Sequence, residues 1–191
     1  MNPQRLSVKF FAQSSSPIDL APFVPLFHHW IQNSTVEGLL VDVARYEHVP
    51  DGPGVLLIAH EVDYGLDLTG GKPGLLVRRK RIDGSGDLAG ILRDTLRKAA
   101  IAATALHTDG STGVQLDAGT VEIALIDRLR APNTPDALAT ATRHIEPVLG
   151  EIYPEGFEMH QGSEDPRACL SLIATSTAAV DFESMLSRLG S

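Results

Sequence analysis

The chain has 191 residues, of which 43% are hydrophobic and 21% are charged, a composition that is typical of globular domains and excludes a disordered chain. Its formal net charge is −8, so its long-range field repels polyanions and argues against nucleic acid and anionic membranes as partners. Cys169 is the single cysteine, which excludes an intramolecular disulfide, and neither a signal peptide nor a membrane-spanning apolar stretch is seen, so we expect a cytoplasmic protein.

The first part of the chain predicts a strand, a helix, several more strands and a second helix. A β-rich composition predicts a strand over residues 6–12, and apolar residues at helical spacing predict a helix that begins after Asp19, with Pro25 delaying its regular part. Further strands are expected over residues 37–46, 55–59, 64–68 and 75–80, with a turn at 70–73. The clearest amphipathic pattern, from Leu88 to Leu106, predicts a helix that covers this antiparallel meander.

The second part of the chain has a similar order with fewer strands. Its start, Thr108 to Gly119, is polar and contains glycine, which predicts a long loop or linker. Strands are expected over residues 120–126, 157–161 and 168–175, and helices over 134–152 and 181–189. Thr134 and Pro135 supply an N-cap and a first helical residue, and Pro147 is expected to kink that helix or end its regular part early.

These elements predict an α+β protein made of two βαββα-like units, residues 1–110 and 111–191. We expect mostly antiparallel sheet with helices packed on one face. The two units could also form one continuous compact domain. Their shared order suggests an ancient duplication, although the residues of the two halves do not align.

One cluster of residues has the chemistry of a catalytic site. His60, Glu61 and Asp63 lie where one apolar strand gives way to the next, and a hairpin there would bring them near His48, with His28 as a further ligand-binding candidate. Imidazole and carboxylate groups can hold a divalent metal or transfer a proton. The alternative is that polar residues simply alternate on a half-exposed antiparallel strand. The sequence identifies neither a metal nor a cofactor.

The basic run Arg78-Arg79-Lys80-Arg81 is an exception in an acidic chain. Its first two residues, Arg78 and Arg79, are candidate ligand-binding residues for a phosphate or a carboxylate. The alternative is a solvated strand end, because runs of like charge are usually exposed.

Two other features receive structural interpretations. Residues 84–90 resemble a dinucleotide-binding turn only loosely, because the glycine spacing is one residue too long, and we expect Ser85 or Asp87 to cap the following helix. Cys169 lies in an apolar run that predicts a buried strand, so we expect a core thiol rather than a nucleophile.

Together these observations favour a module that binds a small molecule or a protein partner without catalysis. One alternative is a metal-assisted or acid/base hydrolase or isomerase centred on His60, Glu61 and Asp63. A second alternative is a structural subunit whose sheet edges pair in a homodimer.

Overall fold

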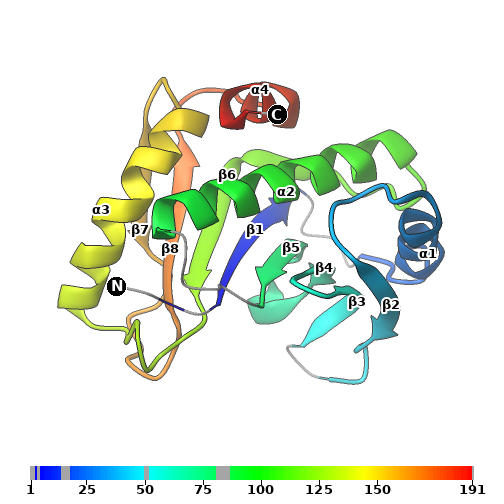
Figure 1. The fold of residues 1–191 in the computed structure, drawn as a ribbon, viewed down its shortest axis with the longest axis horizontal. Helices are drawn as coiled ribbons and strands as arrows, with labels where there is room; N and C mark the ends of the chain where they lie inside the picture. Colours follow the sequence, from blue (N-terminus) through cyan, green and yellow to red (C-terminus); the bar gives the residue numbers. More distant parts are fainter. Residues whose placement is uncertain (1–2, 4, 14–17, 50–51, 81–86, 191) are drawn as a thin grey trace.

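The structure is a computed structural model that describes residues 3, 5–13, 18–49, 52–80 and 87–190. Within these residues the chain forms one antiparallel sheet of eight strands, on which four α-helices pack (Figure 1). The strands are β1 (Leu6–Ala12), β2 (Leu40–Arg45), β3 (Pro53–Ala59), β4 (Val62–Asp67), β5 (Gly74–Arg79), β6 (Leu116–Leu125), β7 (Phe157–Gln161) and β8 (Leu170–Ser176). The helices are α1 (Phe23–Asn33), α2 (Leu88–Asp109), α3 (Pro135–Ile152) and α4 (Phe182–Leu189), and a 3₁₀ turn, η1 (Thr69–Gly71), joins β4 to β5. The predicted α+β class is confirmed.

The strand order is β2-β3-β4-β5-β1-β6-β8-β7. The first strand, β1, lies inside the sheet and pairs antiparallel with both β5 and β6. Because β6 follows the predicted boundary near residue 110, strands from both predicted parts of the chain share one sheet. The division into two βαββα units and the duplication stay predictions.

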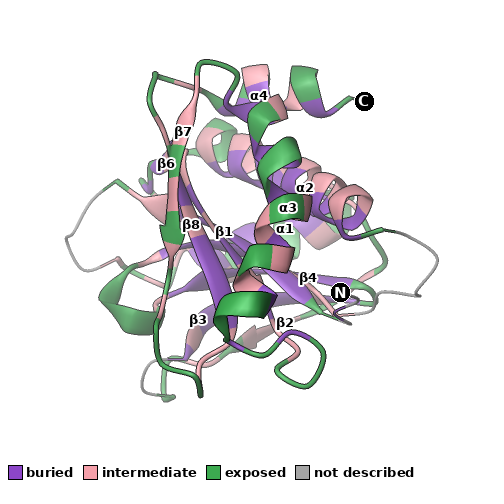
Figure 2. Cartoon of the chain, turned by 90° about the vertical axis from the view of Figure 1, so that its left-hand side faces the viewer, coloured by how far each residue is buried: buried purple, intermediate pink, exposed green. Residues whose placement is uncertain are grey.

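Strand residues alternate between the two faces of the sheet. On β1, Leu6, Val8 and Phe10 are fully buried in the core between sheet and helices. Ser7 and Lys9 therefore project from the opposite face, because successive side chains of a strand point to opposite sides. Figures 1 and 2 show the four helices on one side of the sheet. We call the opposite side the helix-free face.

Three of the four described α-helices, α2, α3 and α4, begin at a side chain that accepts a hydrogen bond from an N–H of the first turn, whereas α1 follows Pro22 and has no such cap. Asp87 Oδ1 accepts a hydrogen bond of 2.8 Å from the N–H of Gly90 at the start of α2, so the predicted cap is confirmed. Thr134 Oγ1 accepts one of 3.4 Å from Ala137 N–H at the start of α3. Pro147 does not end α3, which continues to Ile152.

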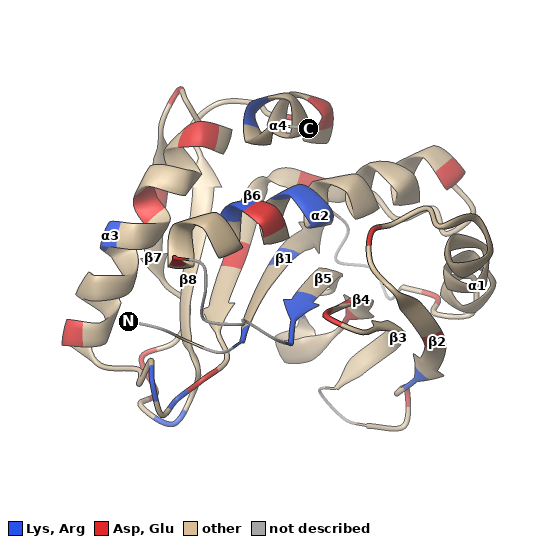
Figure 3. Cartoon of the chain, in the orientation of Figure 1, with Lys and Arg blue, Asp and Glu red and all other residues tan. Residues whose placement is uncertain are grey.

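Residues of both charges lie along α2 (Figure 3), and their ion pairs join the helix to its neighbours. Arg97 donates two hydrogen bonds, of 2.5 and 2.6 Å, to the carboxylate of Glu37, which precedes β2. Lys98 donates to Glu37 at 3.0 Å and to Asp94 at 2.7 Å. These pairs fix the position of α2 over the sheet.

Candidate functional site

A hollow of about 650 Å³ opens on the helix-free face. Its floor consists of side chains from β4, β5, β1, β6 and β8, and two connections flank it. One is the turn from Thr69 to Lys72 between β4 and β5, and the other carries Gly162 and Ser163 after β7. A second hollow of about 410 Å³ shares Phe11, Lys72 and Ile173 with the first, so the two lie next to each other.

Strand pairing fixes the order of side chains across the floor. Arg78 of β5 lies directly opposite Ser7 of β1, and Glu122 of β6 lies directly opposite Lys9 of β1. Directly opposite residues of an antiparallel pair project from the same face. Arg78 and Glu122 therefore both point into the hollow from strands on either side of β1.

A buried ion pair forms part of this floor. Lys9 Nζ lies 2.5 Å from Asp67 Oδ2, and the two side chains are only 5% and 8% exposed. The hydroxyl of Thr69 donates to Asp67 Oδ1 at 2.8 Å, and the Thr69 N–H donates to Oδ2 at 3.3 Å. Buried charges are tolerated when they are paired and hydrogen-bonded. The Lys9–Asp67 pair is thus a fixed structural part of the hollow.

Gly74 explains how Lys9 reaches a residue two strands away. On β5, which separates β1 from β4, Gly74 lies opposite both Phe11 and Asp67. A Cβ at this position would lie 2.3 Å from the Phe10 carbonyl oxygen and 3.1 Å from Lys9 Cε. The missing side chain therefore leaves the path along which Lys9 crosses to Asp67.

Two half-buried charged groups in the hollow, Arg78 and Glu122, are unpaired within the described part of the chain, and the exposed Lys72 also lines the hollow without a partner there. Arg78 makes no hydrogen bond or ion pair with these residues, and its Nε is buried without an acceptor. Glu122 likewise has no partner among them, since its opposite neighbour Lys9 is bound to Asp67. A polar group that loses water without gaining a partner costs free energy, so both groups are suited to meet a ligand.

Asn133 holds the wall of the hollow that follows β7. Its Nδ2 donates to the carbonyl oxygens of Ser163 and Asp165, both at 2.9 Å, and its Oδ1 accepts from Gln161 Nε2 at 2.9 Å. Asn133 is buried, so these bonds are shielded from water. The wall is therefore anchored to the segment that leads into α3.

The structure separates the surroundings of His60, Glu61 and Asp63. His60 and Glu61 are exposed in the turn between β3 and β4, whereas Asp63 is buried on β4. The Asp63 carboxylate lies 2.8 Å from Lys80 Nζ and accepts a hydrogen bond of 3.1 Å from the N–H of Ala59. These contacts give Asp63 a role in fixing the hairpin. A catalytic role for the three residues stays a prediction.

The two histidines proposed to assist them lie in other parts of the fold. His48 is exposed after β2, where its ring stacks on Tyr46 with 6.4 Å between centroids. His28 is exposed on α1. Among the described residues, no group of three or more His, Cys, Asp or Glu side chains is placed to hold a metal ion.

The basic run divides between the two faces of the sheet. Arg79 points toward the helices and forms an ion pair with Asp94 of α2. Its neighbour Arg78 points into the hollow on the helix-free face. Arg81 lies outside the described residues. Strand alternation thus distinguishes Arg78, the residue available to a ligand, from Arg79, which fixes a helix.

The prediction of a core position for Cys169 was wrong. Cys169 is half-buried just before β8 and lines the hollow. Leu170 and Leu172 are the residues of this run that enter the core, so alternation puts Cys169 on the other face. Ala168, Cys169 and Leu170 form an apolar stretch, and such a stretch conceals the alternation.

Sequence reasoning missed Lys9 and Glu122. A signal for both was present, because each is a charged residue that alternates with buried apolar neighbours, as Lys9 does between Val8 and Phe10. That pattern indicates a second sheet face but not that the face forms a hollow.

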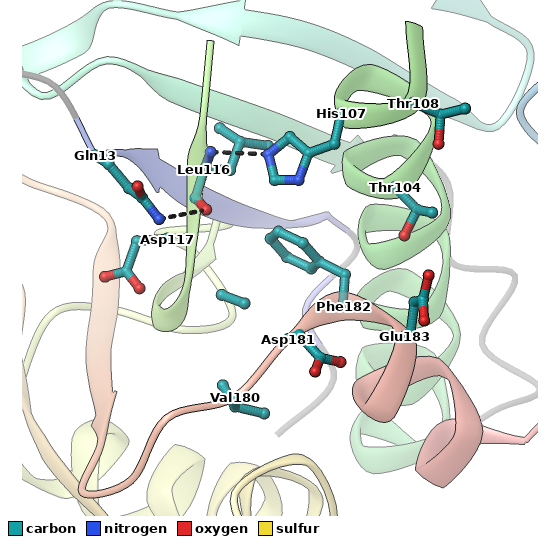
Figure 4. Close-up of a pocket in the computed structure, with 11 residues that line it drawn as sticks. Gln13, Thr104, His107, Thr108, Leu116, Asp117, Val180, Asp181, Phe182 and Glu183 are labelled. Atoms are coloured by element: carbon teal, nitrogen blue, oxygen red, sulfur yellow. Dashed lines mark hydrogen bonds between the residues drawn. The ribbon is translucent and has the colours of Figure 1, made fainter. Parts of the chain in front are cut away.

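A cavity of about 540 Å³ lies between α2, the start of β6 and the start of α4 (Figure 4). The His107 ring projects from α2, and its Nε2 accepts a hydrogen bond of 2.9 Å from the N–H of Leu116. Its ring also contacts Phe182 edge-on, with 5.6 Å between centroids. Burial lowers the pKa of His107, and the hydrogen bond requires an unprotonated Nε2. His107 thus links two elements as a neutral imidazole.

Two of the three carboxylates around this cavity serve the backbone, and the third, that of Glu183, is exposed. Asp181 accepts a hydrogen bond of 2.7 Å from the N–H of Ser184 and caps α4, and Asp117 accepts one of 2.8 Å from the N–H of Gly119. Both groups thus have local structural roles. The hollow on the helix-free face, with its unpaired Arg78 and Glu122, is the better candidate for a binding site.

No protein-family model, curated protein or solved structure matches this chain. Within the part of the chain that the structure describes, none of the helices has the length and apolarity needed to cross a bilayer. Function is therefore inferred from the geometry of the hollow.

Proposed function

We propose that the protein binds a small organic anion in the hollow on its helix-free face and acts in the cytoplasm as a binding module without catalysis. The observation that carries this proposal is the state of Arg78, which reaches the hollow with no partner in the described part of the chain and with its Nε buried. A guanidinium group offers several N–H donors in a planar fork that matches a carboxylate or a phosphate.

The size and surface of the hollow suit a small molecule. Its volume of about 650 Å³ lies within the range of about 300–1,000 Å³ that is typical of ligand pockets. Apolar side chains of Phe11, Leu76, Ile126 and Ile173 line it beside the charged groups. A ligand with an apolar body and one acidic group would meet both kinds of surface.

The local charge also favours an anion. The hollow is lined by the cationic side chains of Lys9, Lys72 and Arg78 and by the anionic side chains of Asp67 and Glu122. This local excess of positive charge occurs in a chain whose net charge is −8. An anion would be repelled by most of the molecular surface and attracted here.

Binding without reaction is the simplest use of this hollow. Lys9 and Asp67 could act as a general acid and base, but they are already held in one ion pair at 2.5 Å. Separating them would leave two buried charges without partners, at a cost of several kcal/mol.

A fluorescent anion tests the proposal. We expect native protein to bind 8-anilinonaphthalene-1-sulfonate, whose sulfonate and aromatic rings fit the hollow, and Arg78→Gln to weaken this binding roughly tenfold, the loss of one charge-assisted hydrogen bond. Arg143→Gln, which removes an exposed arginine of α3, is the matched control and should bind normally. Equal binding by wild type and Arg78→Gln, with both folded by circular dichroism, would reject the site.

The edge strand β2 supports a second candidate function, that of a homodimer subunit. Leu39 just before β2 and Val41 on it are 70% and 61% exposed, and β2 ends the sheet within the described residues. Exposed apolar edges favour pairing with another strand. A dimer in analytical ultracentrifugation that Val41→Lys converts to a monomer would support this function, and a monomeric wild type would exclude it.

A further inference from the structure

Glu122 is the second unpaired, half-buried charge of the hollow. Its carboxylate extends toward the wall after β7, where a Cβ on Gly162 would lie 3.3 Å from Glu122 Oε1. No described residue supplies it with a cation, because Lys9, directly opposite, is bound to Asp67. Glu122 is half-buried, so its carboxylate has lost part of its hydration without gaining a counter-ion.

Arg78 and Glu122 are separated by a distance that a small molecule can span. They lie on the two strands that flank β1, and their opposite neighbours on β1, Ser7 and Lys9, are two residues apart. Two strand spacings of about 4.8 Å and two residues of about 3.4 Å put their Cα atoms on the order of 12 Å apart. Both side chains project from the same face, so their charged ends can contact opposite ends of one ligand.

We propose that the ligand is a zwitterion with its charges at opposite ends of an apolar chain. Its acidic group pairs with Arg78 and its ammonium group pairs with Glu122, while its methylene chain lies over the apolar part of the floor, which includes Leu76. This inference rests on the proposed function, because it takes the Arg78 end of the hollow as the anion site. It adds the class of ligand and the residue that selects it.

Competition with 8-anilinonaphthalene-1-sulfonate tests this assignment with three probes of similar size. The probes are 6-aminohexanoate, which has its charges at opposite ends; its isomer norleucine, which has both charges at one end; and hexanoate, which lacks the ammonium group. Wild type should bind 6-aminohexanoate roughly tenfold more tightly than either of the others, the factor for one charge-assisted hydrogen bond. In Glu122→Gln this preference should disappear while hexanoate binds as well as before or better. Arg78→Gln should weaken binding of all three probes.

The outcomes separate this inference from the function on which it rests. Binding of hexanoate that depends on Arg78, with no preference for 6-aminohexanoate, would overturn the zwitterion and leave the anion site in place. A preference for norleucine, or one that survives in Glu122→Gln, would also overturn it. If wild type binds neither the dye nor any probe, or if Arg78→Gln binds them all as tightly as wild type does, the proposed function itself is rejected. Glu146→Gln, which removes an exposed carboxylate of α3, is the control for a general charge effect.

Discussion

A single missing side chain organises the floor of the hollow. Lys9 reaches Asp67 across β5 because Gly74 leaves that path open. With Lys9 committed to Asp67, its opposite neighbour Glu122 is left without a counter-ion. The distribution of paired and unpaired charges therefore depends on one glycine.

Gly74→Ala should destabilise the protein by about 1–3 kcal/mol, the usual cost of overpacking, because the new Cβ would lie 2.3 Å from the Phe10 carbonyl oxygen. Gly150→Ala is the matched control, since it lies in α3 with open space around its Cα. That change should stabilise the protein by about 0.5–1 kcal/mol, the helix preference of alanine over glycine. Urea unfolding measures both changes, and a neutral Gly74→Ala would show that β5 can move away from β1.

His107 makes stability depend on pH. Its pKa is lowered by burial, so the unfolded chain takes up a proton near the ordinary pKa of about 6.5 while the folded protein resists protonation. The stability that neutral His107 contributes is present above that pH and is lost as the pH falls toward the lowered pKa. His107→Gln keeps an acceptor for the Leu116 N–H and does not titrate, so its disadvantage relative to wild type should shrink between pH 7 and pH 5. A disadvantage of His107→Gln that stays constant over this pH range would contradict this role for His107.

At the scale of elements, α2 packs across strands β1 and β5 in the middle of the sheet. Different residues of this region supply the N-cap of α2, its buried apolar face and its ion pairs with β5 and with Glu37. Two predictions separate the apolar contribution of this helix from the ionic one.

Leu92 lies fully buried in the centre of the apolar face of α2. Leu92→Ala should therefore leave a cavity between α2 and the sheet and lower the free energy of unfolding by about 2–5 kcal/mol. Thermal or urea unfolding measures the loss. A loss under about 1 kcal/mol would mean that the surroundings collapse around the smaller residue. That result would contradict the close packing of Leu92 between α2 and the sheet.

Glu37 tests the ionic contribution. Hydrogen bonds from Arg97, assisted by Lys98, lower the pKa of Glu37 to about 2. A lowered carboxyl pKa adds stability that is present above the unfolded value of about 4.3 and is lost as the pH falls toward the folded pKa. Because the Glu37 side chain is 40% exposed, we expect Glu37→Gln to cost only about 1 kcal/mol at pH 7. The cost should be smaller at pH 3, and a cost that grows at low pH would contradict the assignment.

The sequence predicted most elements because their patterns are local. The alternation in β1, the N-caps Asp87 and Thr134 and the apolar face of α2 each involve residues close in the chain. The start of β6 was missed, because its glycines and an aspartate give this segment the composition of a loop. In the structure, Leu116 and Ala118 of the segment enter the core. Tertiary pairing with β1 outweighs that local composition.

At the scale of the whole molecule, the hollow exists because distant segments share one sheet. Lys9, Arg78 and Glu122 come from three regions of the chain, and β1 brings them together by pairing with both β5 and β6. Arg78 was predictable as a ligand-binding candidate from the basic run. The position of Glu122 in the same hollow was not predictable, because strand order and register are tertiary properties that local patterns do not contain.

The position of Cys169 permits a direct test of the central proposal, that the hollow on the helix-free face is the binding site. Cys169 is the only cysteine and lines this hollow, so a thiol reagent reports on the hollow alone. 8-Anilinonaphthalene-1-sulfonate at about four times its Kd for wild type should slow the modification of Cys169 roughly fivefold, the factor 1 + [L]/Kd for a thiol covered by a ligand. In Arg78→Gln, which we expect to bind the dye roughly tenfold more weakly, the same concentration should slow the modification only about 1.4-fold. An unchanged rate in wild type, under conditions where the dye is bound, would place binding elsewhere and contradict the proposal.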